Sequence, residues 1–103
     1  MAGNENRIQI GDLILIPSNG KAYLGGLPLS LTKTEFGLLL FLIRSEGQEF
    51  SRKQIIEAVH GPDYPATDRS IDNQIMGLRG KLGAYGRLIE TVRGVGYRYR
   101  KEQ

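Results

Sequence analysis

Residues that can hydrogen-bond to the edges of nucleic-acid bases are concentrated in one segment, residues 68–82. Arg69 can pair with guanine, and Asn73 and Gln74 can pair with adenine, because the major groove exposes matching donors and acceptors. At about 100° per residue, these side chains lie on or beside the face of a helix that is opposite its apolar stripe. The segment therefore has the chemistry of a helix that reads DNA. A solvated helix face is the alternative that this segment alone leaves open.

The basic residues of the chain are unevenly distributed. The 103 residues have a net charge of +3, but residues 68–103 hold eight Lys or Arg against four Asp or Glu, and the remainder is slightly acidic. A one-sided basic region is expected of a protein that binds a polyanion such as DNA. A basic surface without a partner would give the same count, so charge by itself does not decide between the two.

Other kinds of chemistry find little support in the composition. A catalytic site needs a nucleophile, an acid–base pair or a metal in mutual reach, whereas the chain has one histidine, no cysteine and no carboxylates paired at a diagnostic spacing. We therefore expect no enzymatic activity, no metal site and no cofactor. The longest apolar run, residues 38–43, is too short to cross a bilayer. Together with the lack of cysteine, this favours a cytoplasmic protein that does not contact a membrane.

Three segments carry the start, stop and periodicity signals of helices. Residues 32–35 and 51–54 are capping boxes, in which the first and fourth residues bond each other's backbone amides. Gly47 and Gly61 follow them as stop signals, and the third helix is expected from Asp68 to Leu82. The first helix is expected to place on one face Phe36, Leu39, Leu40 and Ile43. The third is expected to bury Ile71, Ile75, Leu78 and Leu82.

Short strands are expected on both sides of the helices. Residues 8–31 contain alternating apolar positions between turn signals such as Asn19-Gly20, which predicts an antiparallel sheet of three or four strands. Residues 89–93 and 97–100 are expected to form a hairpin, since the glycines in residues 94–96 supply the positive φ of a tight tip. The order of elements predicts an α+β domain with a sheet, three helices and a closing hairpin.

Four blocks of residues, in order along the chain, resemble the OmpR/PhoB-type response-regulator effector domain. They are residues 31–36 (LTKTEF), 51–55 (SRKQI), 68–79 (beginning DRSID and ending LR) and 91–98 (TVRGVGYR). The resemblance covers about residues 8–100. It implies a winged helix-turn-helix fold with an N-terminal four-stranded antiparallel sheet, three helices and a C-terminal hairpin wing. It also implies that the chain is the effector domain of a two-component transcriptional regulator and that it binds specific double-stranded DNA. The third helix would lie in the major groove and the wing on the adjacent backbone or minor groove.

The resemblance assigns expected roles to the residues that match its motifs. The residues expected to read bases are Arg69, Ser70, Asn73 and Gln74. The residues expected to contact the DNA backbone or to form the wing contact are Arg52, Arg79, Lys81, Thr91, Arg93, Gly94 and Tyr97. The residues in the loop that the family uses toward RNA polymerase are His60, Asp63 and Tyr64. The chain is accordingly expected to bind tandem half-sites as a dimer and to be a monomer in isolation.

The boundaries of the domain and its main partner are further expectations. Residues 8–101 are expected to form the winged-helix domain, and residues 1–7 a linker remnant or disordered tail. Because the receiver domain of the family is absent from these residues, we expect the chain to be the effector part of a longer regulator. A winged-helix module whose main role is contact with a protein, RNA polymerase or a partner regulator, is the alternative. The basic third helix and wing favour DNA over that alternative.

The chain departs from the family pattern at three positions of the third helix. Many relatives have a run of basic residues where this chain has Met76, Gly77 and Gly80. Fewer cations neutralise fewer phosphates, so we expect weak non-specific affinity and a shallow dependence on salt. The tryptophan that the family has near the end of its second helix is also absent, and no role is carried over for it.

Overall fold

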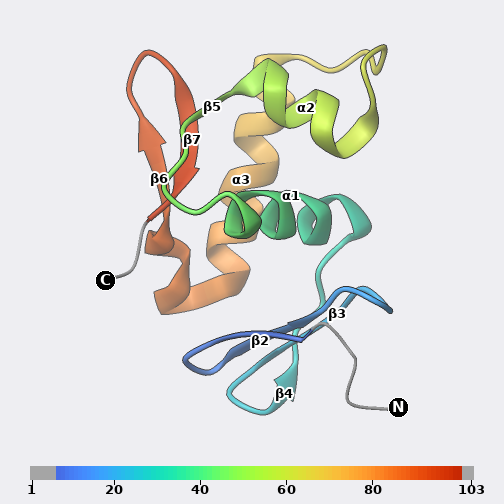
Figure 1. The fold of residues 1–103 in the computed structure, drawn as a ribbon, viewed down its shortest axis with the longest axis vertical. Helices are drawn as coiled ribbons and strands as arrows, with labels where there is room; N and C mark the ends of the chain where they lie inside the picture. The colour runs from blue at the N-terminus through green and yellow to red at the C-terminus, as the bar shows by residue number, and fades with distance from the viewer. Residues whose placement is uncertain (1–6, 101–103) are drawn as a thin grey trace.

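The computed structural model describes residues 7–100. Most of the predicted tail, residues 1–6, and the last residue of the predicted domain, residue 101, lie outside this range. The elements follow the predicted order of a sheet, three helices and a hairpin (Figure 1). In the part of the chain that the structure describes, no helix combines the length and apolar character needed to cross a membrane.

The N-terminal sheet has four antiparallel strands, the upper end of the predicted number. They are β1 (Ile8–Ile10), β2 (Leu13–Ile16), β3 (Lys21–Leu24) and β4 (Leu27–Pro28), in that order across the sheet. Leu15 is paired with Ala22, and both are buried. The turn predicted at Asn19-Gly20 joins β2 to β3, and Gly20 has a φ of 69°, which favours glycine.

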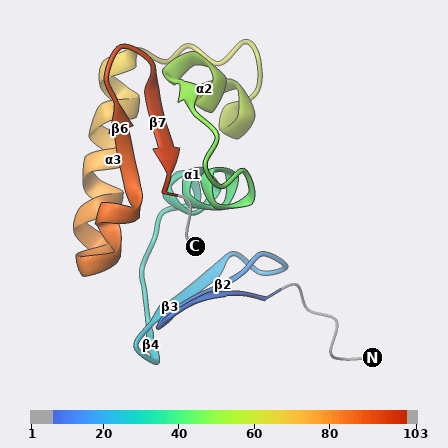
Figure 2. The same ribbon diagram turned by 60° about the vertical axis from the view of Figure 1, so that its left-hand side comes forward.

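Helix α1 (Lys33–Arg44) lies at the centre of the domain, between the N-terminal sheet and the other helices (Figures 1 and 2). Its predicted capping box is confirmed, because Thr32 and Glu35 accept hydrogen bonds from each other's backbone N–H. The predicted face is only partly right, since Leu38 and Leu42 are fully buried whereas Leu40 and Ile43 are half-buried. The physical reason is that α1 is covered on two sides, which widens the buried arc beyond one stripe.

Gly47 does not stop α1 in the way the sequence predicts. The helix ends at Arg44, and its C-cap is Ser45, two residues before the glycine. Gly47 has a φ of 84°, and its N–H donates to the Tyr99 carbonyl oxygen at 2.9 Å. The glycine therefore ties the segment after α1 to the C-terminal hairpin.

Helices α2 (Arg52–His60) and α3 (Asp68–Leu82) form the helix-turn-helix. The capping box at Ser51 and Gln54 is confirmed, and α2 ends directly before Gly61, whose φ is 98°. Helix α3 has the predicted bounds, and the Thr67 hydroxyl caps it by accepting from the Ser70 N–H at 3.2 Å. The predicted stripe of α3 is buried, with exposures of 0–1% for Ile71, Ile75, Leu78 and Leu82.

The C-terminal hairpin belongs to a second, three-stranded sheet that the sequence analysis missed. Strands β6 (Ile89–Val92) and β7 (Gly96–Tyr99) form the hairpin, and β7 also pairs with β5 (Phe50–Ser51), just before α2. A Cβ at Gly96 would collide with the Phe50 carbonyl oxygen, so glycine allows this close pairing. A 3-10 helix at Gly83–Leu88, also not predicted, connects α3 to β6.

Candidate nucleic-acid interface

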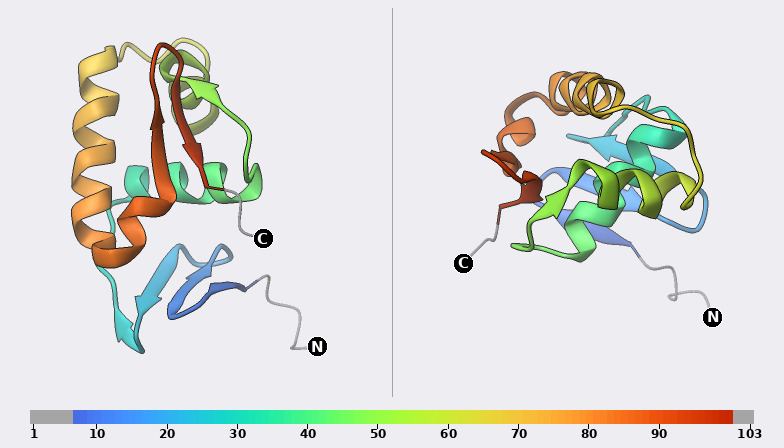
Figure 3. Two further views of the ribbon diagram at one scale, coloured as in Figure 1. Left: turned by 90° about the vertical axis from the view of Figure 1, so that its left-hand side faces the viewer. Right: turned by 90° about the horizontal axis from the view of Figure 1, so that it is seen from above.

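Helix α3 and the β6–β7 hairpin, here called the wing, lie side by side along one edge of the domain (left panel of Figure 3). Arg79 of α3 joins them, because its Nε and Nη2 donate to the Ile89 carbonyl oxygen at 3.0 and 2.7 Å. The Arg79 Nη2 also donates to the Thr91 hydroxyl at 3.0 Å. The guanidinium therefore sets the distance between the helix and the first strand of the wing.

A second connection passes through Tyr97 of β7, in what we call the Tyr97 cluster (Arg52, Asp72, Arg79 and Tyr97). The Tyr97 hydroxyl donates to Asp72 Oδ1 of α3 at 2.6 Å, and Arg52 Nε of α2 donates to the same oxygen at 2.7 Å. The Arg52 and Arg79 guanidinium carbons each lie 5.5 Å from the centre of the Tyr97 ring, within cation–π range. The cluster thus fixes the start of α2, the middle of α3 and the wing relative to one another.

The charges of this cluster reinforce one another. Hydrogen bonds from Arg52 and from the Tyr97 hydroxyl lower the pKa of Asp72. Burial raises the pKa of Tyr97, and the neighbouring Asp72 carboxylate raises it further. Asp72 also raises the pKa of Arg52. The carboxylate and the guanidinium therefore stay charged, and the phenol stays protonated, across the neutral pH range.

Lys81 at the end of α3 has a partner on α1. Its Nζ donates to Glu35 Oε1 at 2.7 Å, and the same oxygen accepts from the Thr32 N–H at 2.9 Å. Burial opposes the ionisation of Glu35, but the hydrogen bonds from Lys81 and Thr32 outweigh it, so the pKa of Glu35 is lowered. The pair holds the C-terminal half of α3 against the start of α1.

Two predicted base-reading residues, Arg69 and Asn73, are exposed on the outer side of α3. Within residues 7–100, neither side chain makes a hydrogen bond or an ion pair. Ser70 is half-buried, and its hydroxyl donates to the Thr67 carbonyl oxygen at 2.8 Å. Gln74 is half-buried, and its buried Oε1 accepts no hydrogen bond from the described part of the chain. The freely available polar groups of this face are therefore those of Arg69 and Asn73.

The residues predicted to contact the backbone divide into two groups. Arg93 and Gly94 are exposed at the tip of the wing, and Arg93 has no partner within residues 7–100; Thr91, also exposed, is bonded to Arg79. Arg52, Arg79, Lys81 and Tyr97 have the internal partners described above, and Tyr97 is only 4% exposed. These four side chains position α3 and the wing, an arrangement the sequence analysis missed because the partners of each lie 10 or more residues away along the chain.

The loop predicted to face RNA polymerase lies between α2 and α3, away from the outer side of α3. Its aromatic residue Tyr64 stacks on His60, with ring centres 3.9 Å apart and planes inclined by 13°. Tyr64 and Asp63 are exposed. The two rings border a cavity of about 790 Å³ between α1 and α2, whose lining includes the basic residues Lys33 and Arg44. The loop thus presents an exposed Tyr64 ring that is held in place by stacking on His60.

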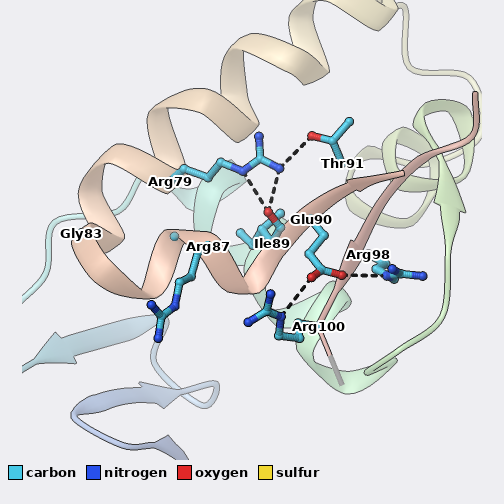
Figure 4. Close-up of a pocket in the computed structure, with 9 residues that line it drawn as sticks. Arg79, Gly83, Arg87, Ile89, Glu90, Thr91, Arg98 and Arg100 are labelled. Carbon is cyan, nitrogen blue, oxygen red and sulfur yellow. Dashed lines mark hydrogen bonds and ion pairs between the residues drawn. The ribbon is translucent and has the colours of Figure 1, made fainter. Parts of the chain in front are cut away.

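A shallow cationic groove runs along the flank of the wing (Figure 4). It encloses about 690 Å³ and is lined by four arginines and one acid: Arg79, Arg87, Arg98, Arg100 and Glu90. Glu90 accepts from Arg98 Nε at 2.9 Å and from Arg100 Nε at 3.0 Å, which lowers its pKa. Arg87 points away from Glu90. Arg87 lies in the 3-10 helix, which was not predicted from the sequence, and no role was predicted for this residue.

Three helices, of which the last two form a helix-turn-helix, followed by a hairpin packed beside the third, define a winged helix-turn-helix domain. The N-terminal four-stranded sheet places it in the predicted α+β class. A family model, described as the C-terminal domain of transcriptional regulatory proteins, matches residues 26–99. The chain belongs to this family, and its resemblance to the OmpR/PhoB-type effector domain is confirmed.

The chain is similar to several named regulators. It is 41% identical over 98 residues to the response regulator MprA of Mycolicibacterium vanbaalenii, covering 93% of this chain and 42% of the relative. It is 34% identical over 97 residues to the phosphate regulon transcriptional regulatory protein PhoB of Pseudomonas aeruginosa, covering 93% and 42%. The chain therefore spans about two fifths of the length of these curated relatives.

Two solved structures have the same fold. One is the RstA DNA-binding domain of Klebsiella pneumoniae, crystallised in complex with the RstA box, with a TM-score of 0.79 and 34% identity over 92% of this chain and 97% of that one. The other is the DNA-binding domain of CpxR from E. coli, with a TM-score of 0.80 and 34% identity over 94% and 98%. The likeness therefore extends over nearly the whole of each of these domains.

Proposed function

We propose that this chain binds specific double-stranded DNA as the effector domain of a two-component transcriptional regulator, with α3 in the major groove and the wing on the adjacent backbone or minor groove. One observation carries the proposal. The exposed, unbonded side chains of Arg69 and Asn73 lie on the outer side of α3, and the wing beside this helix carries the exposed Arg93 at its tip. Pairing groups on a rigid helix next to a cationic loop are what direct reading of DNA requires.

We assign the direct contacts on the basis of exposure and partners. Arg69 and Asn73 would pair with bases, with Ser70 and Gln74 beside them, because these four share or flank the outer side of α3. Arg93, Gly94 and Thr91 would contact phosphates from the wing; the exposed Thr91 accepts a hydrogen bond from Arg79, and its hydroxyl can still donate one to a phosphate. Arg52, Arg79, Lys81 and Tyr97 would act through position, since their polar groups are bonded within the domain.

Selection from a pool of random duplexes, followed by fluorescence anisotropy across salt concentrations, tests the proposal. Asn73→Ala and Arg69→Ala are each expected to relax base preference at one position and to cost about 1–3 kcal/mol on the selected site. Arg93→Ala is expected to weaken binding to all sequences alike. Lys21→Ala removes an exposed cation from the N-terminal sheet and serves as the control. The absence of any enriched sequence from a folded sample would refute the proposal.

The fold supports a second partner for the α2–α3 loop. We infer that His60, Asp63 and Tyr64 form a contact for RNA polymerase, because the stacked rings give an exposed aromatic surface away from the outer side of α3. Tyr64→Ala is expected to leave DNA affinity unchanged and to reduce transcription from a target promoter. A module that only contacts proteins would instead retain its function after loss of Arg69, Asn73 and Arg93, which separates the two proposals.

The remaining inferences concern assembly and location. We infer that the domain is a monomer in isolation, that two copies occupy tandem half-sites on DNA, and that it acts in the cytoplasm without catalysis, metal or cofactor. Within residues 7–100, no cluster of His, Asp and Glu is arranged to hold a metal ion. Sedimentation of the chain with and without a duplex that carries one or two selected half-sites measures the stoichiometry. A single copy on the tandem duplex would refute the dimeric mode.

A further inference from the structure

Met76 is a large apolar side chain in an unusual place, the outer side of α3. It is 68% exposed, whereas the buried stripe of the same helix is 0–1% exposed. A single exposed apolar residue on a protein surface is ordinary. Met76 differs from an ordinary exposed apolar residue because it lies within the candidate nucleic-acid interface.

Met76 lies between the wing and the polar groups of α3. It follows Asp72 by four residues and precedes Arg79 by three, so the three side chains form one strip along the helix. Asp72 and Arg79 bond to Tyr97 and to Ile89 of the wing, which places this strip on the wing side of α3. Met76 also follows the exposed Asn73 by three residues, one turn along the helix. It therefore borders both the base-pairing face and the wing.

Two glycines of α3 lie near Met76 and add no side chain to the surface of the helix there. Gly77 is its neighbour in sequence, and Gly80 lies one turn further along. Both destabilise a helix relative to alanine. A Cβ at Gly80 would meet no atom within 4 Å, so packing inside the domain does not require that glycine. The missing side chains at these two positions allow a partner surface to approach α3 closely beside the thioether of Met76.

We propose that Met76 reads the C5-methyl group of thymine in the major groove, an inference that rests on the proposed DNA-binding function. Thymine is the base that presents a methyl group there, and an apolar side chain in contact with it distinguishes thymine from cytosine. The flexible, polarisable thioether of methionine adapts well to a small apolar surface. Because Asn73 and Met76 are one turn apart, the thymine lies within one or two base pairs of the base that Asn73 contacts.

Replacement of thymine by deoxyuracil tests this inference, because it removes the methyl group and keeps every hydrogen-bonding edge. Each thymine of the selected duplex is replaced in turn, and the affinity of the 103-residue chain is measured by fluorescence anisotropy. One or two positions are expected to lose about fourfold in affinity, the effect of one methyl group no longer buried. Met76→Ala is expected to bind the thymine duplex about fourfold more weakly and to be insensitive to the same replacements. Met76→Leu is expected to keep the sensitivity.

Leu27→Ala is the matched control, because Leu27 is 69% exposed but lies in β4 of the N-terminal sheet. It is expected to change neither the affinity nor the sensitivity to deoxyuracil. If the wild-type chain binds its selected duplex and no thymine position shows a loss that depends on Met76, the inference is wrong while the proposed function stands. If no duplex is selected at all, the proposed function fails, and the inference fails with it.

Discussion

Deletion of the Tyr97 hydroxyl tests whether the Tyr97 cluster holds the wing to the helices. Tyr97→Phe keeps the buried ring and removes the 2.6 Å hydrogen bond to Asp72. A hydrogen bond to a charged group contributes about 1.5–3 kcal/mol. Because Asp72 is 39% exposed and keeps its bond to Arg52, water can replace part of the loss. We therefore expect the free energy of unfolding to fall by about 1–2 kcal/mol.

Urea denaturation at neutral pH measures this change as a lower midpoint with an unchanged slope, a shift of roughly 1 M. Tyr23→Phe makes the same deletion at a half-buried tyrosine whose hydroxyl has no hydrogen bond within residues 7–100, and is expected to have little effect. In an Asp72→Ala background, Tyr97→Phe should cost much less, because the two groups are coupled. Equal costs in both backgrounds would show that the hydroxyl does not act through Asp72.

Four further substitutions test the charges and glycines of α3. The pKa of Asp72 is lowered in the folded state, so its carboxylate stabilises the fold fully above about pH 4, and this stabilisation is lost as the pH falls through the folded pKa. Asp72→Asn should therefore make the free energy of unfolding, measured in urea titrations, fall less steeply with decreasing pH. Lys81→Met should lower the free energy of unfolding by about 1–2 kcal/mol, because Glu35 loses its ion pair and keeps only the hydrogen bond from the Thr32 N–H, and it should barely change the DNA affinity measured by anisotropy. Gly80→Arg should raise the non-specific DNA affinity and steepen its salt dependence by about one phosphate contact. Gly77→Arg should do the same, but its new Cβ would lie 3.3 Å from Glu35, so its urea midpoint should be lower than that of Gly80→Arg.

The parts of the fold that the sequence predicted well are those set by local interactions. The capping boxes at Thr32 and Ser51 involve residues three apart, so their hydrogen bonds can be predicted without knowledge of the fold. The bounds of α3 were predictable because its apolar stripe is regular and buried on one side only. Strand β5 was missed because it has two residues, which exist as a strand only where Phe50 meets Tyr97 across the sheet.

The candidate site was predictable to a smaller extent, for the same physical reason. The exposure of Arg69 and Asn73 follows from helical periodicity, which the sequence contains. The roles of Arg79 and Tyr97 depend on partners that only the folded chain brings within reach, Ile89 and Asp72. A motif match assigns such residues a role in DNA binding, but it does not separate the residues expected to contact DNA from those that hold α3 and the wing in place.

In the part that the structure describes, the cations of the basic C-terminal third also divide into those bonded within the domain and those without such a partner. Of the cations in residues 68–100, four are bonded to groups of the domain itself: Arg79, Lys81, Arg98 and Arg100. Within the described residues, Arg69, Arg87 and Arg93 have no such partner. Each neutralised phosphate adds about −0.9 to the slope of log affinity against log salt, so with three such cations in this region we expect a shallow dependence. We therefore expect the proposed DNA specificity to depend on base contacts from α3 more than on charge, with the uncharged outer residues Asn73 and Met76 contributing as much as the arginines.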